Sequence, residues 1–514
     1  MKEQISIINR VAIGDVIRRT ASKFGNKEAV VDGDKRYTYR DVYTHTNQVA
    51  NYLSVNLGFE KGDKVATLCL NSYEYIIAMY GIQKAGLVWV PINPGLTTSD
   101  IDYILKEANV RLVIGDAMLL KKHASIMSPY AQLVTPRSDE ANCFTKAYSS
   151  ASSDEPNVHI EDRDIAQIMF TSGTTGNPKG VCISHIAVHM ASMANAIEMK
   201  VEADDALIAV MPYFHCAQHV FLQTFFLVGG KIIVSQKFDP IVFFETIQSE
   251  KITFIFALPI MYRALIFHPN RSKYDLSSLN KCLYAMAPMD QTTLRTGIEQ
   301  LNADFYLATG QTEMYPATVV FKPQYQLTKV GSYWGEPSVI NDAVIMDEEG
   351  RILGKHVVGE IVHRGPNVMS SYLNNPQATA EVQKFGWHHT GDLGYMDDDG
   401  LIVFVDRKKD MIKTGGENVA SIQIEQVLLN CEHVENAVVV GLPHPVWIEA
   451  VTSFVKVKDG VTKEMIHAYC KANLAGFQVP KEIILVEEFP MTSTGKIQKQ
   501  KLRATYDTIY STVK

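Results

Sequence analysis

Strand and helix signals alternate along residues 28–116, and this alternation restricts the fold more than any other feature of the sequence. A helix between two strands carries the chain back along the sheet, so the two strands pair in parallel. Parallel sheets are covered by helices on both faces. We expect strands at Ala29–Val31, Lys64–Leu70, Leu87–Ile92 and Arg111–Ile114, and helices that begin near Thr38, Tyr73 and Ser99. The sequence therefore predicts an α/β fold with a largely parallel sheet.

The alternation of strand and helix signals resumes after a polar loop at 149–164. The pattern of these signals then changes near residue 330 and again near residue 406. Further strands are expected at Ile165–Phe170, Leu207–Met211, Lys231–Val234, Ile252–Phe256 and Asn280–Tyr284. From about residue 330, short strands with frequent Gly predict a small β subdomain. The charged junction Asp406–Asp410 precedes a separate pattern with a turn at Gly415–Gly416, a helix over Ser421–Leu429 and a strand over Ala437–Val440. We predict an N-terminal domain over 1–406, with mostly parallel sheets flanked by helices plus the β subdomain, and an α+β C-terminal domain over 407–514.

Composition excludes several classes of protein. The 514 residues are 46% hydrophobic and 20% charged, with a net charge of −7, which argues against a general nucleic-acid binder. The seven cysteines are scattered without a C-x-x-C pair, as in a protein with reduced thiols. No secretory signal and no apolar run long enough for a membrane span is visible. We expect a cytoplasmic protein, and the sequence leaves a monomer and a homodimer open.

The most informative motif follows the expected strand Ile165–Phe170 and reads Thr171-Ser-Gly-Thr-Thr-Gly-Asn-Pro-Lys-Gly180. Its glycines allow backbone N–H groups to approach a ligand closely, and its four hydroxyls and Lys179 suit phosphate oxygens. A flexible surface loop is the alternative, but four hydroxyls and a lysine behind a buried strand are unusual for one. The spacing of the common nucleotide-hydrolase loop, G-x-x-x-x-G-K-[ST], is absent. The stretch therefore predicts a polyphosphate site of another class.

Four further motifs indicate a function only when they are considered together. Thr309-Gly-Gln-Thr-Glu313 follows an apolar strand and offers a hydroxyl for phosphate and a carboxylate for Mg²⁺. Asp392, which ends Trp387-His-His-Thr-Gly-Asp, and Arg407 could bind the two hydroxyls of a ribose. The stretches Asp410–Gly416 and Pro490–Lys496 complete the set. Each motif alone would be better explained as an ordinary capped turn or a solvated lysine.

In order and spacing, the five stretches resemble those of the adenylate-forming superfamily, which includes acyl-CoA synthetases, firefly luciferase and peptide-synthetase adenylation domains. The match covers nearly all of the chain and is closest in character to the fatty-acyl- and coumarate-type CoA ligases. The resemblance implies an ATP-dependent ligase that converts a carboxylic acid to acyl-AMP and then transfers the acyl group to CoA. It also implies that Mg²⁺ assists and that the C-terminal domain is mobile. Alternatives are an enzyme that loads a carrier protein or oxidises the adenylate, and, less favoured, a non-catalytic nucleotide-binding protein.

The resemblance also implies individual roles. The catalytic residues would be Lys496, Glu313, Thr312, His215 and Lys179, with Glu313 as the metal ligand. Lys496 would bridge the substrate carboxylate and the α-phosphate, and His215 would gate the acyl site. The cofactor-binding residues would be Thr171, Ser172, Gly173, Thr174, Thr175, Gly176, Lys179, Ala308, Thr309, Gln311, Thr312, Asp392, Arg407, Lys409, Lys413, Gly416 and Asn418. Lys409 would lie at the hinge, and Gly416 where the pantetheine passes.

The chain departs from the family at several positions, and these bear on the substrate. Thr309 stands where relatives usually have an aromatic residue that stacks on adenine, and His444 and Ile448 stand where Asp and Gly are common. Residues 213–218 contain no carboxylate that could pair with the ammonium group of an amino acid. Gly310 replaces the tryptophan of acetate-type synthetases, which predicts room for a longer or aromatic acid, lined by Phe214, Met286 and Met314.

Overall fold

The computed structural model describes residues 8–135, 142–171, 177–285, 289–491 and 497–511. The chain forms two compact units, and each is described by itself. Unit 1 comprises Met1–Val330, Trp334–Asp342 and His363–His388, and unit 2 comprises Gly331–Tyr333, Ala343–Val362 and His389–Lys514. This division groups the short strands around 343–362 with the C-terminal part of the chain. The functional boundary at 406–410 stays a prediction.

Unit 1 contains a seven-stranded sheet that carries the phosphate-loop motif. In pairing order its strands are β18 (Ser371–Tyr372), β8 (Lys179–Ser184), β7 (Ile165–Thr171), β4 (Val88–Pro91), β3 (Lys64–Leu68), β5 (Val110–Asp116) and β6 (Ala131–Thr135). The strands from β7 to β6 are parallel, whereas β8 and β18 are antiparallel additions at one end.

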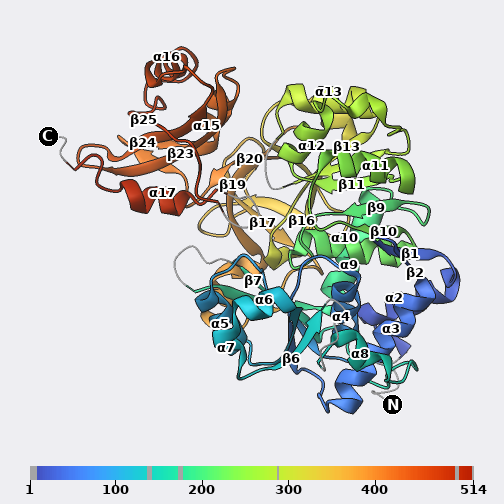
Figure 1. Ribbon diagram of the computed structural model, residues 1–514. Coiled ribbons are helices and arrows are strands. Elements are labelled where there is room, and N and C mark those ends of the chain that lie inside the picture. The colour runs from blue at the N-terminus through green and yellow to red at the C-terminus, as the bar shows by residue number, and fades with distance from the viewer. Residues whose placement is uncertain (1–7, 136–141, 172–176, 286–288, 492–496, 512–514) are drawn as a thin grey trace. The chain divides into compact units, whose positions relative to one another are not determined.

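Side chains alternate between two cores on the faces of this sheet, as the period of a strand requires. Leu112 and Ile114 point into one core and Val113 into the other. The second core is closed by α5, α6 and α7 (Figure 1). Helices therefore cover both faces, as the alternation of strands and helices predicted.

A second sheet in unit 1 is also mainly parallel. Its strands pair in the order β15 (Tyr333–Pro337), β14 (Val319–Phe321), β13 (Asp304–Thr309), β12 (Lys281–Tyr284), β11 (Phe254–Ala257), β9 (Ala206–Ala209), β10 (Lys231–Val234), β1 (Glu28–Asp32) and β2 (Lys35–Thr38). Its parallel part runs from β13 to β1.

Helices of unit 1 lie around and between these sheets. The longer ones are α2 (Ile13–Phe24), α3 (Tyr39–Asn51), α4 (Tyr73–Lys84), α5 (Thr98–Glu107), α9 (His185–Glu198), α10 (Cys216–Val228), α11 (Pro240–Glu250), α12 (Pro259–Ile266) and α13 (Gln291–Leu301). The shorter ones are η1 (Tyr52–Asn56), α6 (Ala117–Lys122), α7 (Ala124–Met127), α8 (Phe144–Ser149), η2 (Arg271–Lys273), η3 (Thr312–Met314), η4 (Pro323–Tyr325), α14 (Pro376–Val382) and η5 (Lys384–Gly386). None of the helices in the described residues combines the length and the apolar character that crossing a bilayer requires.

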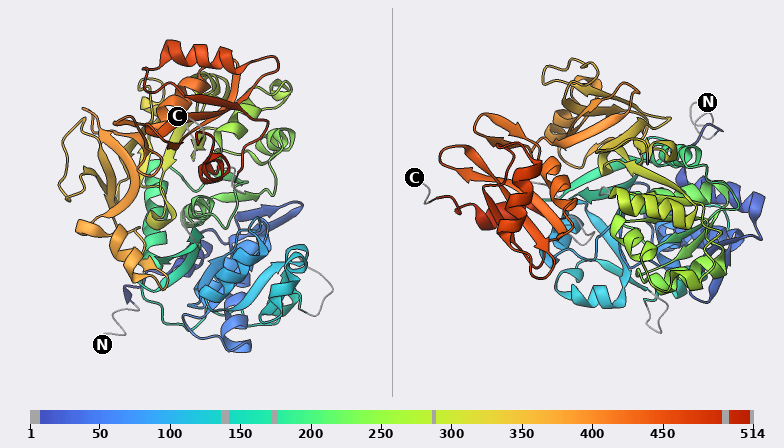
Figure 2. Two further views of the ribbon diagram at one scale, coloured as in Figure 1. Left: turned by 90° about the vertical axis from the view of Figure 1, so that its left-hand side faces the viewer. Right: turned by 90° about the horizontal axis from the view of Figure 1, so that it is seen from above.

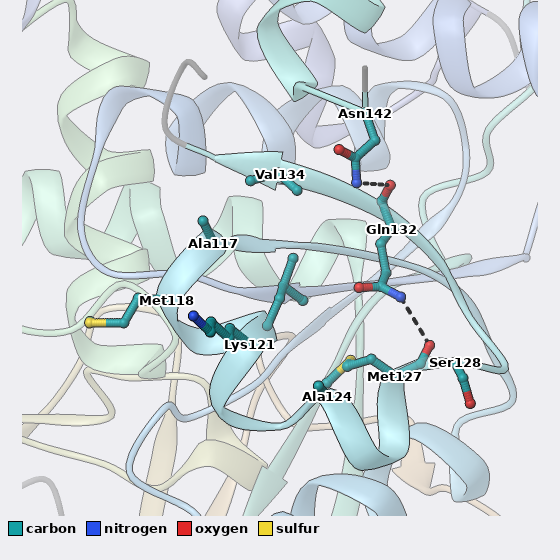
Figure 3. A pocket seen from close by; sticks show the side chains of 10 residues that line it. Ala117, Met118, Lys121, Ala124, Met127, Ser128, Gln132, Val134 and Asn142 are labelled. Carbon is teal, nitrogen blue, oxygen red and sulfur yellow. Dashed lines mark hydrogen bonds between the residues drawn. The ribbon is translucent and has the colours of Figure 1, made fainter. Parts of the chain in front are cut away.

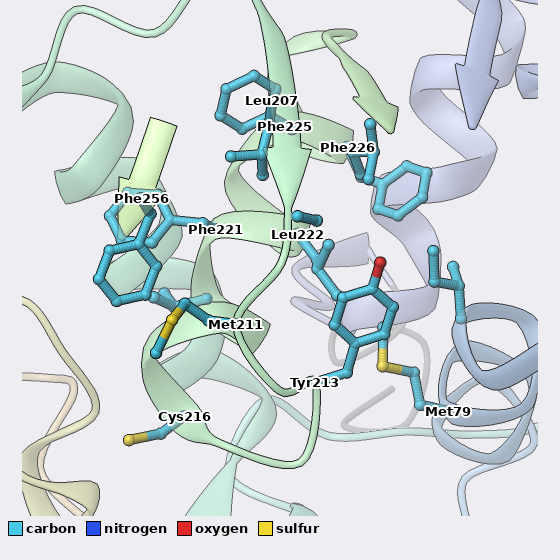
Figure 4. Packing of buried hydrophobic residues seen from close by; sticks show 14 of the residues in the cluster. Met79, Leu207, Met211, Tyr213, Cys216, Phe221, Leu222, Phe225, Phe226 and Phe256 are labelled. Atoms are coloured by element: carbon cyan, nitrogen blue, oxygen red, sulfur yellow. The ribbon is translucent and has the colours of Figure 1, made fainter. Parts of the chain in front are cut away.

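The largest core lies around α4 and α10. All twelve residues of α4 are buried, as expected for a helix that is apolar on every side. In Figure 4, Phe221, Leu222, Phe225 and Phe226 project from α10 among side chains of α4 and of the second sheet. This packing fixes the start of α10, where His215 and Cys216 lie.

Unit 2 has its own sheets and helices. Short strands pair in the order β16 (Asp342–Met346), β17 (Gly359–Arg364), β19 (His388–Met396) and β20 (Ile402–Arg407). A five-stranded sheet follows, with β22 (Glu417–Val419), β21 (Ile412–Thr414), β24 (Ile448–Val457), β23 (Val434–His444) and β25 (Glu482–Leu485). One face packs against α15 (Ser421–Leu429) and α16 (Lys463–Asn473), the other against α17 (Lys499–Tyr506) (Figures 1 and 2). The predicted α+β arrangement is therefore present.

Two local predictions differ from the structure, and one strand was missed. The helix expected to begin near Ser99 has Thr97 as its N-cap, because Thr97 and Asp100 form the reciprocal capping box. The strand β1 pairs in parallel with β10 and antiparallel with β2 in the second sheet, and not with β3, the next strand that was expected along the chain. The polar strand β2 was not predicted, since its side chains lack an apolar pattern. By contrast, the capping box of Thr38 and Asp41 is present as predicted.

Candidate active site

The base of the phosphate loop is held by the antiparallel pair β7–β8. Thr171 and Lys179 lie opposite each other in the register of this pair, and Thr171 Oγ1 donates to the Lys179 carbonyl at 3.5 Å. The loop therefore leaves and re-enters the sheet at one point, with the Lys179 side chain exposed there. The predicted residues Ser172, Gly173, Thr174, Thr175 and Gly176 lie outside the described residues.

The Thr309–Glu313 motif turns out of β13 into the short helix η3. Thr312 Oγ1 lies 3.6 Å from the Cys216 thiol, which ties η3 to the start of α10. The Thr309 hydroxyl is buried and has no hydrogen-bond partner among the described residues. An unpartnered buried hydroxyl at this place fits a site that is completed by a polar ligand. Ala308 is buried beside it, and Gln311 and Glu313 are half-buried.

Glu313 and Lys179 are brought together by a residue that the sequence did not reveal, Tyr372. Its hydroxyl donates to Glu313 Oε1 at 2.9 Å, and Lys179 Nζ lies 5.0 Å from its ring centroid. A tyrosine before Asn374-Asn-Pro carries no chemical signal on its own. The turn residues Asn374-Asn-Pro indicate only that a strand ends near Tyr372.

His215 is the N-cap of α10, and its Nδ1 accepts from the Ala217 amide at 3.2 Å. The next residue, Cys216, is buried, and burial raises the pKa of its thiol to about 12. One turn further, His219 Nδ1 hydrogen-bonds the hydroxyl of Tyr315, two residues after Glu313. Burial lowers the pKa of His219 to about 3, so this imidazole is neutral at physiological pH. Two residues of α10 thus contact Thr312 and Tyr315, which precede and follow Glu313 in the sequence.

The predicted ribose-binding pair lies in unit 2. Asp392 and Arg407 face each other in the register of β19 and β20, and Arg407 Nε lies 3.4 Å from Asp392 Oδ1. Asp392 is buried, whereas Arg407 is half-exposed. The structure therefore brings this pair together across one hairpin.

The residues predicted for the CoA step share a second hairpin in unit 2. Lys413 and Asn418 pair across β21 and β22, and the turn between them contains Gly416 with φ of 91°. Only glycine adopts this conformation without strain. Lys409 is exposed just before this hairpin, and Lys496 lies outside the described residues.

The departures at His444 and Ile448 have different structural consequences. His444 Nδ1 accepts from the amides of Val446 and Trp447 at 3.1 and 3.3 Å, which are the hydrogen bonds that an Asp at this place can accept. Its ring also stacks on Trp447, with centroids 4.3 Å apart. Ile448 has φ of 71°, a conformation that suits the usual Gly and strains a β-branched residue.

Gly310 requires a correction to its predicted role. A Cβ at this position would lie 2.8 Å from Cβ of Pro316, so the space beside Gly310 is already filled. The small residue is needed for this close contact and does not by itself open an acyl pocket. Of the other predicted lining residues, Met314 is buried and Phe214 half-buried, and Met286 lies outside the described residues.

A surface hollow of about 650 Å³ lies elsewhere, between α6, α7 and β6 (Figure 3). Met118, Leu120, Met127 and Val134 line it, together with Gln132, whose side chain donates to the Met127 carbonyl at 3.1 Å. It contains none of the predicted site residues.

Comparison with known proteins agrees with the geometry. The chain matches the AMP-binding enzyme family over residues 17–373 and the AMP-binding enzyme C-terminal domain over residues 423–496. A feruloyl-CoA synthase of Amycolatopsis sp is 32% identical over 94% of this chain and 97% of its own length. Long-chain-fatty-acid–CoA ligase FadD13 of Mycobacterium tuberculosis is 30% identical over 96% of this chain and 98% of its own length. The crystal structure of ATP-bound MatB from Rhodopseudomonas palustris has a TM-score of 0.89 at 27% identity, covering 97% of this chain and 99% of that one.

The chain therefore belongs to the AMP-binding enzyme family, within the adenylate-forming superfamily. Both curated relatives are CoA ligases, and each is matched over nearly its whole length. The protein is an AMP-forming acyl-CoA synthetase, whose substrates are a carboxylic acid, ATP and CoA.

Proposed function

We propose that this acyl-CoA synthetase activates an aryl or a medium- to long-chain carboxylic acid, with Mg²⁺ held at Glu313. The observation that carries the proposal is the cluster in unit 1 where Lys179, Thr312 and Glu313 converge around Tyr372 and the start of α10. These residues supply a cation, a hydroxyl and a carboxylate at one place, which is the set that a polyphosphate and its metal ion require.

Electrostatics governs the first half-reaction. A substrate carboxylate must attack an α-phosphate that is also negatively charged. Lys179 would bind the outgoing phosphates, and Lys496 would neutralise charge between carboxylate and α-phosphate as the new bond forms. When bound, Mg²⁺ withdraws charge from the phosphate oxygens. The half-buried Glu313 fits this ion, since carboxylate oxygen is a preferred ligand and Tyr372 occupies only one of its oxygens.

Orientation of the nucleotide would come from two further groups. Asp392 can accept from both ribose hydroxyls while Arg407 donates to the same sugar. The unpartnered hydroxyl of Thr309 can hydrogen-bond the nucleotide, which would compensate in part for the missing aromatic residue at this position. Holding the two reactants in line can contribute up to ~7–11 kcal/mol to the lowering of the barrier.

The second half-reaction needs a different arrangement, because the CoA thiol attacks the acyl-adenylate from another direction. Lys413, Gly416 and Asn418 would serve this step, since one exposed hairpin presents all three. In this scheme the C-terminal domain rotates about a hinge at Lys409. The rotation withdraws Lys496 from the acyl-adenylate and brings the hairpin with Lys413, Gly416 and Asn418 to it.

The proposed acid class rests on the turn before α10 and on the relatives. Residues 213–218 contain no carboxylate, and Gln218 Oε1 is already engaged by the Met211 amide at 3.1 Å. The ammonium group of an amino acid would therefore lack a partner there. The two curated relatives named above are a feruloyl-CoA synthase and a long-chain fatty-acid–CoA ligase. Each methylene buried by a longer acid adds ~0.8 kcal/mol of binding.

A substrate screen tests the proposal. The purified protein is incubated with ATP, Mg²⁺ and CoA and with acids from acetate to palmitate, benzoate, cinnamates and free amino acids. We expect AMP release and CoA thioester in equal amounts, with efficiency rising steeply from acetate to the larger acids. Best activity on acetate or on an amino acid would overturn the acid class. AMP release with thioester only on a carrier protein would overturn the CoA step.

A further inference from the structure

Tyr372 is fixed in place by backbone hydrogen bonds on both sides. The Ser370 amide donates to the Cys182 carbonyl at 2.9 Å, and the Leu373 amide donates to the Gly180 carbonyl at 2.7 Å. The Tyr372 amide donates to Thr379 Oγ1 of α14 at 2.9 Å. The side chain is 7% exposed. Its phenol ring therefore has a defined position at the edge of the sheet that carries the phosphate loop.

Two groups of opposite charge contact this one side chain. The hydroxyl donates to Glu313 Oε1 at 2.9 Å, while the Lys179 ammonium lies 5.0 Å from the ring centroid. The backbone adds a further link, because the Met369 amide donates to the Glu313 carbonyl at 2.8 Å. The segment 369–373 thus joins β8, which carries Lys179, to η3, which carries Glu313.

The chemistry of these contacts suits a nucleotide site. A hydrogen bond to one carboxylate oxygen orients the group and leaves Oε2 available to a metal ion. A cation over an aromatic face is held without losing its charge, so the ammonium can still bind phosphate. A direct ion pair between Lys179 and Glu313 would instead neutralise both groups before the nucleotide arrives.

We propose that Tyr372 is a positioning residue of the ATP site: its hydroxyl aims Glu313 at the metal–phosphate complex, and its ring holds Lys179 beside it. This inference rests on the function proposed above. It assigns separate tasks to the two ends of one side chain, and the tasks can be separated by substitution. Tyr372→Phe removes the hydroxyl and keeps the ring, whereas Tyr372→Leu removes both.

The test measures ATP binding by calorimetry, with Mg²⁺ and with EDTA, on the full-length protein without acid or CoA. For Tyr372→Phe we expect affinity for ATP in Mg²⁺ to fall about tenfold or more, while affinity in EDTA stays near that of the wild type. The Mg²⁺ concentration that gives half-maximal AMP release should rise as well. For Tyr372→Leu, affinity should fall under both conditions, because Lys179 also loses its support.

Tyr284→Phe is the matched control, since it removes a buried hydroxyl that hydrogen-bonds Gln326 Oε1 at 2.8 Å in the same unit. It should leave both affinities unchanged. In a Glu313→Gln background, Tyr372→Phe should have no further effect on binding in Mg²⁺. This comparison also identifies a loss that comes from general misfolding, because misfolding would weaken binding in that background too.

Equal losses in Mg²⁺ and EDTA for Tyr372→Phe, or no loss at all, would overturn the proposal. So would an undiminished effect in the Glu313→Gln background. Failure of the proposed function would look different, because the wild type itself would then bind no ATP or form no acyl-CoA.

Discussion

Ile448 is a β-branched residue that the structure holds in the left-handed region of backbone conformation. Its φ of 71° lies in the left-handed region, and its side chain is 70% exposed, so burial offers little in return. A β-branched residue in this region costs about 1–2 kcal/mol. Glycine avoids this strain but loses about 0.5–1 kcal/mol through the greater freedom of the unfolded chain.

We therefore predict that Ile448→Gly raises the free energy of unfolding of unit 2 by up to about 1 kcal/mol. Val446→Gly is the control, because Val446 is similarly exposed at 65% and lies outside the left-handed region. It should lower stability by about 0.5–1 kcal/mol. Urea unfolding of the two variants gives the comparison. Equal losses in both would show that Ile448 is not strained.

The residues of the site were predictable to different degrees, for physical reasons. Lys179 and Glu313 were singled out because their motifs resemble those of a known superfamily, and the structure places both in contact with Tyr372. Tyr372 was not found, because a tyrosine is ordinary in a strand and its role arises from a contact 59 residues away in sequence. The misreading of Gly310 has the same origin, since its neighbour Pro316 follows a turn that the sequence does not reveal.

The helix α17 is anchored by two ion pairs. Lys499 Nζ lies 2.8 Å from Glu425 Oε1 of α15 and donates to Ser421 Oγ at 2.7 Å. One turn later, Arg503 donates to Asp410 Oδ1 at 2.8 Å. The Lys499 and Glu425 side chains are only 18% and 15% exposed. Removing one partner of such a pair leaves a charge that is mostly buried and unpaired.

We predict that Lys499→Met lowers the stability of unit 2 by about 2–3 kcal/mol. Adding Glu425→Gln should recover part of this loss, because the unpaired carboxylate is then gone. Hydrogen exchange of α15 and α17 measures the effect locally. Lys501→Met, at an exposed position of the same helix, should change little. If the loss of stability in the double variant equalled the sum of the two single losses, the interaction between Lys499 and Glu425 would contribute nothing to stability.

Elements were predicted well where the signal is local. The helix Ser421–Leu429 and the strand Lys231–Val234 have the expected bounds, since apolar periodicity and flanking turn residues define them. The start of α5 was predicted too late, because Thr97 and Asp100 form the capping box and the overlapping Ser99-x-x-Asp102 pattern does not. Membership of β1 in the second sheet depends on pairing with β10, about 200 residues away, which no local pattern encodes.

For the whole molecule, three buried histidines predict sensitivity to acid. Burial lowers the pKa of His219 and His363 to about 3 and that of His185 to about 4. In the unfolded chain these groups take up protons near pH 6.5. Between pH 6.5 and about 4 the unfolded state therefore binds more protons, so stability falls as the pH falls, by up to about 1.4 kcal/mol per pH unit for each group.

We predict that His219→Gln reduces the loss of stability between pH 7.5 and pH 5 measured by urea unfolding. The variant can be less stable than the wild type at both values, because the change in slope is the result that matters. His433→Gln, at a position with a 40% exposed side chain, should leave the slope unchanged. Equal slopes in all three proteins would mean that His219 is not protonated on unfolding in this range.

We predict that substitutions at Lys496 and at Gly416 each impair a different half-reaction. Lys496→Ala should slow formation of the acyl-adenylate by on the order of 10²–10³-fold and spare thioester formation from supplied adenylate. Gly416→Trp should do the opposite, and Gly416→Ala serves as its control for backbone strain, because φ is 91° there. If Lys496→Ala and Gly416→Trp each slowed both steps equally, the proposed rotation of the C-terminal domain between the two steps would be contradicted.

All seven cysteines are buried, and burial raises the pKa of Cys216, beside the site, to about 12. Thiol reagents act on accessible thiolates, so the folded protein should react very little with them. In a reaction mixture, the thiol signal then belongs to free coenzyme, and its disappearance can be followed continuously without correction for the protein. A slow rise in labelling during storage would in turn report the fraction of molecules that have unfolded.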